Sequence, residues 1–401
     1  MLADEINMVQ GRQIHQVSFV RRPSSLFLSA MFVLMLFSFK AEAVSLGAYQ
    51  EEKTPGTWEI KDYSSHITLF FGLTLKKMRP KPFSSFREFS QFYKNDIKKG
   101  DPAAGYMEQS VKAFFLNGGK VLYILPLKNK KAANFYWTAS KSNKLKNIGI
   151  VAVPGYGALP SNLRDEFEKI LVKHVNDSPG RFALLETPQG KEISQLRLKN
   201  RTDNGAKFGP WLRVGNPTTG AVVPPTGFIA GGIARTDLNR GIHKSPGGLE
   251  ARLIGAVGTE TEIPNSQEGA YNKPGINSFL IRPGQKLFIW GGKTYDPYGN
   301  YRYIAVARTA RYLGSNIKAQ IGKYMTFEAV NPYSLAKIKR TVSLYLERHR
   351  RNGMFAGASA QKSYFIKFET QGAKTYCILG FALVNPGEFV VIQFAVEGAE
   401  F

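Results

Sequence analysis

The sequence has a single cysteine and only five histidines, which limits the metal and redox chemistry open to it. Cys377 alone cannot form an internal disulfide bond or a cysteine-rich zinc or iron–sulfur site. It lies in an apolar strand pattern, for which a buried, unreactive thiol is the usual outcome. No two histidines stand at the spacing of a helical zinc motif, and His174 with Asp177 is interpreted as a solvated pair on a helix. The histidines are His15, His66, His174, His243 and His349. We therefore expect neither a metal ion nor a cofactor.

Sequence motifs for catalysis are equally scarce. No G-x-S-x-G nucleophile motif occurs. Gly292-Lys293-Thr294 resembles the end of a phosphate-binding loop, but that motif needs a glycine five positions before its last glycine, where this chain has Leu287. We interpret these three residues as a turn at the end of a strand. Because nothing arranges a nucleophile, a base and an oxyanion site, we predict that the protein is not an enzyme and has no catalytic residues.

Acidic residues are outnumbered, with 30 Asp and Glu against 54 Lys and Arg, so the 401-residue chain carries a formal charge of +24. Such a charge favours an acidic partner. No zinc finger and no RNA-binding aromatic motif accompanies the basic residues, so the charge alone does not indicate nucleic acid. With 43% hydrophobic residues the chain is globular, and its length suggests two to three domains.

The first 43 residues have the order of a secretory signal. Arg21 and Arg22 precede an apolar run over 26–39, and Ala41-Glu42-Ala43 follows as a small-x-small cleavage site. The run is shorter than the ~20 residues that a membrane-spanning helix needs. An alternative interpretation places the true start at Val44, with the upstream residues never made. Both interpretations stay open, and the basic character belongs to the body of the protein in either case.

From about residue 44 the hydrophobic pattern alternates between strands and helices. Helices are predicted over 84–97, with Ser84 as N-cap, 104–116 and 161–177, and strands over 121–127, 148–155 and 182–188. Buried strands that alternate with helices predict an α/β domain with a mixed, partly parallel sheet. Residues 189–285 are rich in Gly, Pro, Asn and Thr, for which we expect long structured loops.

The last third of the chain predicts an α+β domain of two helices and an antiparallel sheet. A strand over 286–292 precedes helices over 304–324 and 333–351, and three strands follow over 363–369, 375–384 and 388–397. We therefore divide the chain into a leader or upstream extension (1–43), an N-terminal linking arm (44–68), an α/β domain with long central loops (69–285), a C-terminal domain (286–385) and a C-terminal strand arm (386–401). Both arms are expected to be extended.

The helix over 333–351 concentrates positive charge. Its apolar stripe consists of Leu335, Ile338, Val342, Tyr345 and Leu346. Basic residues lie on or beside the opposite face, namely Lys337, Lys339, Arg340, Arg348, Arg350 and Arg351, with Glu347 as the one acidic member. The pattern is compatible with an ordinary solvated face and with a docking face for an acidic surface.

Segment by segment the chain resembles the contractile tail sheath family of phage tails, R-type bacteriocins and extracellular contractile injection systems. The segments that carry the resemblance are PGTWE (55–59), FREFSQFY (86–93), VKAFFLNGGKVLYILPL (111–127), RFALLETP (181–188), the central run PWLRVGNPTTGAVVPPTGFIAGGIARTDLNRGIHKSPGG (210–248), GINSFLIRPGQKLFIWGGKT (275–294), YIAVAR (303–308) and PGEFVVIQF (386–394). Together they cover about residues 50–401 in the order of the family. The chain departs from the family at 242–246, where Trp-Lys-Ala-Pro is common, and in its signal-like leader.

This resemblance implies a structural subunit. Sheath subunits of the family form stacked hexameric rings around an inner tube, and contraction drives the tube through a target envelope. It further implies inter-subunit arm strands and an inner-tube docking helix. The residues concerned are Thr57, Trp58, Glu59, Phe389, Val390, Val391 and Ile392 for the arms, and Lys337, Lys339, Arg340, Arg348 and Arg351 for the helix.

The expected partners are other copies of the chain, the inner tube, the baseplate, sheath paralogues and a terminal cap, with no nucleic acid. Assembly is expected in the bacterial cytoplasm as part of a phage-tail-like particle that can be released, while the signal-like segment leaves export open. A basic nucleic-acid-binding protein or an exported hydrolase is the alternative function.

Overall fold

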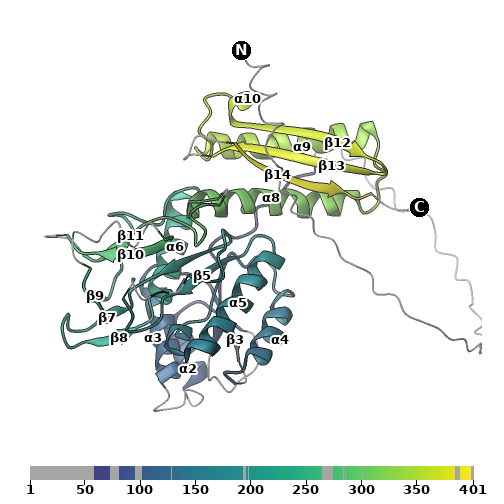
Figure 1. Cartoon of the computed structure of the whole chain (residues 1–401). Helices are drawn as coiled ribbons and strands as arrows, with labels where there is room; N and C mark the ends of the chain where they lie inside the picture. Colours follow the sequence, from purple (N-terminus) through teal and green to yellow (C-terminus); the bar gives the residue numbers. More distant parts are fainter. Residues whose placement is uncertain are drawn as a thin grey trace, which may run out of the picture.

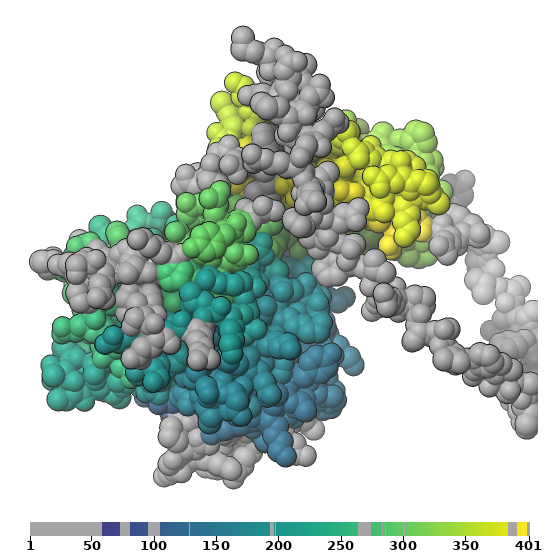
Figure 2. Space-filling view, viewed as in Figure 1, coloured from purple at the N-terminus to yellow at the C-terminus, as the bar shows by residue number. Residues whose placement is uncertain are grey.

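The computed structural model describes residues 58–72, 81–94, 102–127, 129–192, 196, 198–263, 274–282, 284, 286–299, 301–383 and 389–398. They form an α/β unit followed by a smaller C-terminal unit (Figure 1). In the space-filling view the C-terminal unit, drawn in yellow and green, rests on the teal α/β unit (Figure 2). The leader and most of the predicted N-terminal arm lie outside the described residues.

The α/β unit is built on an eight-stranded mixed sheet with the order β11-β10-β6-β5-β4-β1-β3-β2. Its six inner strands are parallel neighbours, and β2 and β11 are antiparallel strands at the two edges. The strands are β1 (Thr68–Gly72), β2 (Lys81–Phe83), β3 (Leu122–Pro126), β4 (Ile150–Ala152), β5 (Phe182–Glu186), β6 (Gly205–Phe208), β10 (Ile276–Leu280) and β11 (Phe288–Trp290). A small antiparallel sheet lies beside it, with β7 (Leu212–Val214) between β8 (Ala221–Val223) and β9 (Ala256–Thr259).

Helices cover both faces of the large sheet, which explains why its inner strands read as continuous apolar runs. Phe70 of β1 belongs to the core under α2 (Phe86–Tyr93), α3 (Pro102–Leu116) and α6 (Thr226–Arg240). Leu69 and Phe71 point the other way, into the core under α4 (Ala132–Ser142) and α5 (Ser161–Asp177). The helix predicted to begin after Ser84 in fact has Ser85 as N-cap, whose side chain accepts from the Glu88 N–H.

Helix α6 lies within the stretch for which the composition predicts loops, and that expectation is wrong there. Its glycines serve close packing against α3. A Cβ atom at Gly227 would lie 2.1 Å from the carbonyl oxygen of Ser110, and one at Gly231 would lie 2.3 Å from that of Phe114. The two helices can approach this closely only because these positions lack a side chain. The glycines of α6 therefore reflect a close contact between two helices, and they do not indicate a segment without regular structure.

The C-terminal unit packs two long helices on one face of a three-stranded antiparallel sheet. These are α8 (Ile304–Met325) and α9 (Pro332–Arg351), and the sheet order is β12-β13-β14. Its strands are β12 (Tyr364–Gln371), β13 (Lys374–Ala382) and β14 (Phe389–Val396), and the short α10 (Ala360–Ser363) leads into β12. Asn331 caps α9 in a reciprocal capping box with Ser334. Cys377 is buried in β13 as predicted, and burial raises the pKa of its thiol to about 12.

The predicted fold class of an α/β domain with a mixed sheet followed by an α+β domain is thus confirmed for the described residues. Two boundaries shift. Because β11 pairs with β10, the α/β unit extends beyond the boundary predicted at residue 286. Strand β14, assigned to a separate arm, pairs along its full length with β13 of its own chain, from Ala382 opposite Phe389 to Thr375 opposite Val396.

A buried ion pair joins the two units. Arg308 of α8 donates to both carboxylate oxygens of Asp237 of α6 over 2.8 and 2.6 Å, and to the carbonyl oxygen of Ser65 over 3.1 Å. Both charged side chains are almost fully buried. Replacing only one of them would strongly destabilise the fold, because the other charge would be left buried without its partner. Figure 1 shows α8 lying between the three-stranded sheet and the α/β unit, where this contact forms.

The close approach of α6 and α3 gives a test within one helix. Gly227→Ala should destabilise the protein by about 1–3 kcal/mol, because the added Cβ meets backbone that cannot move cheaply. Gly232→Ala is the matched control, since a Cβ there meets nothing within 4 Å and alanine is the better helix former. Thermal unfolding of both variants measures the difference. Equal melting temperatures would contradict the packing described.

Candidate docking surface on the basic helix

Helix α9 buries one face and exposes the other, as its hydrophobic pattern predicts. Ile338, Val342 and Leu346 are fully buried against α8 and the sheet. On the outer face Tyr333 is 71% exposed and Leu344 is 55% exposed, although both are large apolar side chains. The outer face of the helix is therefore a mixture of basic and apolar groups, which a purely solvated face does not require.

The predicted docking residues fall into two groups. Lys339, Arg340 and Arg351 are exposed, and Arg351 shares Glu347 with Arg350. Lys337 and Arg348 instead contact the chain's own neighbouring segments. The ammonium of Lys337 lies 5.0 Å from the ring centre of Tyr324 in α8, and Arg348 donates to Glu59 and Asp62 over 3.1 Å each.

The segment over 58–62 lies along α8 and α9 and is not a strand. Trp58 stacks on Tyr324 with 4.9 Å between ring centres, and Ile60 is buried in the core of the C-terminal unit. Glu59 forms its ion pair with Arg348. Of the predicted arm residues at this end, Trp58 and Glu59 therefore rest on their own chain, and Thr57 lies outside the described residues.

Asp62 is the hydrogen-bonding centre of this contact. Its carboxylate accepts from the hydroxyl of Tyr345 over 2.7 Å, from the amide of Asn316 over 3.3 Å and from Arg348, and it lies 3.2 Å from Nε2 of His349. Burial raises the pKa of Asp62, but the hydrogen bonds from His349, Tyr345 and Tyr312 outweigh it and lower the pKa to about 2. The segment is therefore held by a carboxylate that stays charged at neutral pH. The sequence gives no sign of this network, because Asp62 is more than 250 residues away from Asn316, Tyr345, Arg348 and His349.

The predicted arm residues at the other end, Phe389, Val390, Val391 and Ile392, all lie in β14. Val391 is exposed, whereas Ile392 packs against α8 beside Gly314. Strand β14 is an edge strand of its sheet, and β12 is the edge strand on the other side. A role in pairing with a neighbouring copy stays a prediction.

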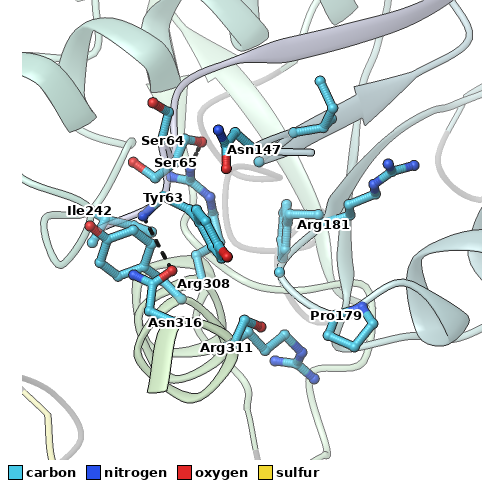
Figure 3. A pocket seen from close by; sticks show the side chains of 16 residues that line it. Tyr63, Ser64, Ser65, Asn147, Pro179, Arg181, Ile242, Arg308, Arg311 and Asn316 are labelled. Carbon is cyan, nitrogen blue, oxygen red and sulfur yellow. Dashed lines mark hydrogen bonds between the residues drawn. The ribbon is translucent and has the colours of Figure 1, made fainter. Parts of the chain in front are cut away.

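A hollow lies between α8 and the amino ends of β4 and β5 (Figure 3). The N–H of Tyr63 donates to Asn316, and Arg308 bonds to Ser65 at its wall. Its volume of about 70 Å³ is far below the ~300 Å³ of a small-molecule pocket. Open α/β sheets bind ligands at the carboxyl ends of their strands, and this hollow is at the opposite edge. We interpret it as the seam between the two units.

Buried polar clusters in the α/β unit have structural partners. His174 is buried, and its Nε2 lies 2.7 Å from Nη1 of Arg181. The interpretation of His174 and Asp177 as a solvated pair is therefore wrong. Asp177 instead forms an ion pair with Lys173. Burial and the Arg181 charge lower the pKa of His174 to about 3. The other Arg181 donors bind Ser142 and the carbonyl of Leu145, which joins the end of α4 to β5.

Glu186 ends β5 in a fully buried site. Its carboxylate accepts from the N–H groups of Gly155 and Gly157, each over 3.1 Å, and from the hydroxyl of Thr226 at the start of α6. Burial raises the pKa of Glu186 to about 7, although these hydrogen bonds act to lower it. The group therefore ties the β4–α5 connection to α6 and titrates near neutral pH.

Over the described ranges, no group of three or more His, Cys, Asp or Glu side chains could hold a metal ion. Within the same residues no helix has both the length and the apolarity needed to span a membrane. The apolar run at 26–39 lies outside them.

The raised pKa of Glu186 predicts a pH dependence of stability. A carboxyl group with pKa 4.5 when unfolded and about 7 when folded binds its proton more tightly in the folded state. Its contribution is complete below pH 4.5 and is lost as the pH rises to 7, on the order of 3 kcal/mol. Denaturant titrations at pH 5 and pH 7.5 should show this slope, and Glu186→Gln should flatten it. The exposed Glu192→Gln is the control, and an unchanged slope in Glu186→Gln would contradict the assignment.

Comparison with known proteins agrees with the described geometry. Residues 137–295 match the sequence model of the family described as phage tail sheath protein central domain. No curated protein matches the sequence. The fold is similar to the sheath of an extracellular contractile injection system, PVC, in the contracted state, with TM-score 0.66 and 19% identity over 91% of this chain and 98% of the other.

Two further solved structures share the fold. The helical sheath of the anti-feeding prophage in the contracted state has TM-score 0.69 and 22% identity, over 88% of this chain and 99% of the other. The sheath tail protein from Desulfitobacterium hafniense has TM-score 0.61 and 9% identity, over 90% and 100%. The family match and the fold together confirm the resemblance predicted from the sequence: residues 137–295 are similar to the central domain of phage tail sheath proteins, and the chain has the fold of contractile sheath proteins.

Proposed function

We propose that the protein is a structural subunit of a contractile sheath. Copies assemble as stacked hexameric rings around an inner tube, and contraction drives the tube through a target envelope. The observation that carries the proposal is the match of residues 137–295 to the sheath central domain within a fold that covers nearly all of known sheath chains. In this assembly the partners are other copies, the inner tube, the baseplate, sheath paralogues and a terminal cap, without nucleic acid. Assembly takes place in the bacterial cytoplasm, before any release of the particle.

The outer face of α9 is the proposed contact with the tube. Lys339, Arg340 and Arg351 project charge from it, and none is buried in the subunit's own core. A single exposed ion pair is worth only about 0.2–1 kcal/mol and is screened by salt. Six copies per ring make the total attachment firm through multivalency, while each contact stays weak enough to release during contraction.

The two ends of the chain are the proposed links between subunits. Trp58, the first described residue, lies beside α9, and β14 is an edge strand. An extended segment can join an exposed sheet edge by main-chain hydrogen bonds. Each such bond contributes about 1 kcal/mol net, so a five-residue strand supplies a few kcal/mol. Links of this kind stay joined while the rigid units between them rotate, which makes contraction a cooperative change of packing.

Electron microscopy of the purified full chain tests the proposed function. We expect the protein alone to form hollow tubes built of rings, since sheath subunits join without a nucleotide or a cofactor. A monodisperse particle that stays monomeric at high concentration and low salt would contradict self-assembly. A gel shift with duplex DNA that weakens steeply with salt, without polymers, would favour the nucleic-acid alternative.

Charge reversal on the outer face of α9 tests the tube contact. The double variant Lys339→Glu and Arg340→Glu should abolish extended sheath on the tube while leaving the melting temperature nearly unchanged, because both side chains are exposed. The matched control is Lys141→Glu with Lys144→Glu at the exposed end of α4, which makes the same change of charge elsewhere. Arg348 is unsuitable, since its reversal would release Glu59 and Asp62. Normal tube-bound sheath from the α9 variant would refute the assignment.

A further inference from the structure

Helix α4 carries two large aromatic side chains on its outer face. Tyr136 is 55% exposed and Trp137 is 53% exposed, whereas Phe135 of the same helix is buried. Ala133 and Ser140, about one turn before and after, are exposed and too small to cover the two rings. Figure 1 shows α4 at the edge of the α/β unit, apart from α9. A solvated helix does not require two adjacent exposed rings, and they indicate a surface for interaction.

The segment around these rings is basic throughout. Residues 129–147 contain five lysines and neither Asp nor Glu. Four of these lysines are exposed, namely Lys131, Lys141, Lys144 and Lys146. The ammonium group of Lys141 lies 3.4 Å from the centre of the Trp137 ring, so positive charge and aromatic area are presented at one place. We use the term α4 surface for the exposed side chains of Lys131, Tyr136, Trp137, Lys141, Lys144 and Lys146.

The neighbouring helix α5 does not neutralise this charge. It packs beside α4 through stacked aromatic rings, and its acidic side chains toward solvent are Asp165, Glu166 and Asp177. Two of them already have lysine partners, since Asp165 pairs with Lys199 over 2.8 Å and Asp177 pairs with Lys173 over 2.7 Å. Glu166 adds a single negative charge beside the lysines of α4. The α4 surface therefore keeps a net positive charge.

The combination of aromatic rings and lysines matches the surface of an anionic lipid bilayer. Tyr and Trp prefer the boundary between membrane and water, because their rings are apolar and carry one polar group. Lysine stems can lie along apolar material while their ammonium groups reach lipid phosphates. The exposed face of a helix is convex, and a bilayer can meet a convex face without a matching groove. An acidic protein would need such a groove, so it is the weaker candidate.

We infer that the α4 surface binds anionic membranes. Tyr136 and Trp137 lie at the level of the lipid headgroups, and the exposed lysines face the lipid phosphates. The electrostatic attraction extends over about one Debye length, ~8 Å at physiological salt, so the α4 surface itself must meet the bilayer. The inference goes beyond the proposed sheath function, and it involves neither α9 nor the chain ends. In an assembled particle each copy supplies one such contact, so that individually weak contacts add up.

Vesicle flotation of the purified full chain tests the inference, because lipid-bound protein rises in a density gradient while protein polymers sediment. We expect the chain to float with phosphatidylcholine vesicles that contain about one third phosphatidylglycerol, and to be released at high salt. Phosphatidylcholine alone should not bind it. The double variant Lys141→Glu and Lys144→Glu should bind about tenfold more weakly or worse. The matched control is Lys339→Glu with Arg340→Glu on α9, which makes the same change of charge and should bind like the unmodified chain.

Three results of this experiment would overturn the inference. The first is no flotation with the anionic vesicles. The second is an equal loss of binding in the two double variants, which would show that binding follows net charge and not the α4 surface. The third is a chain that shifts duplex DNA but does not float with vesicles. Each of these leaves the sheath function standing, because electron microscopy tests assembly without lipid.

Fluorescence quenching locates the contact on the molecule. Brominated lipids in the anionic vesicles should quench the tryptophan emission of the unmodified chain. Trp137→Phe should lose most of this quenching, because Trp211 is buried and Trp58 and Trp290 are half-buried. Trp137→Ala should weaken vesicle binding about tenfold, whereas Trp137→Phe should keep most of it, since a ring is retained. Both variants change an exposed side chain, so their melting temperatures should stay close to that of the unmodified chain. Unchanged quenching in Trp137→Phe would place the contact elsewhere and overturn the inference.

Discussion

The segment from Trp58 to Ser65 is the constraint on which the arrangement of the two units depends. Asp62 binds side chains from α8 and α9, Tyr63 bonds to Asn316, and Ser65 bonds to Arg308, before the chain enters β1 in the middle of the large sheet. Each hydrogen bond is modest alone. Together they hold the segment from Trp58 to Ser65 across the boundary between the two units, next to the buried ion pair of Arg308 and Asp237. The described part of the predicted N-terminal arm, from Trp58 onward, is therefore attached to α8 and α9 before the chain enters β1.

Because of this attachment, α9 has a different environment on each of two sides. On one side of the helix Arg348 pairs with Asp62 of the segment from Trp58 to Ser65. On the outer face Arg340, Leu344 and Tyr333 are exposed to solvent. A docking partner on the outer face would contact both the helix and Trp58 of this segment. Under the proposed function, the tube contact and the link to the neighbouring subunit meet on one helix, which is the arrangement that a mechanical subunit needs. The hollow at the boundary between the two units, of about 70 Å³, is far below the ~300 Å³ of a small-molecule site.

Long periodic segments were predictable from the sequence because their own side chains define the pattern. The helix at 161–177 and the two long C-terminal helices fall where the apolar spacing places them, within one residue at their ends. Helix α6 was not predictable, since its glycines weaken the helical pattern and their reason lies on α3, more than 100 residues away. Strand β11 was assigned to the wrong unit because three residues do not reveal their pairing partner. The basic face of α9 was visible in the sequence, whereas the use of Arg348 to hold Asp62 depends on a contact that only the fold creates.

The most direct measurement of the central claim is a helical reconstruction by electron cryomicroscopy of the protein assembled with its tube. The account predicts six copies in each ring, α9 facing inward against the tube, and chain ends paired with the sheets of neighbouring copies. A reconstruction in which α9 faces outward, or in which each copy keeps both of its ends to itself, would contradict it.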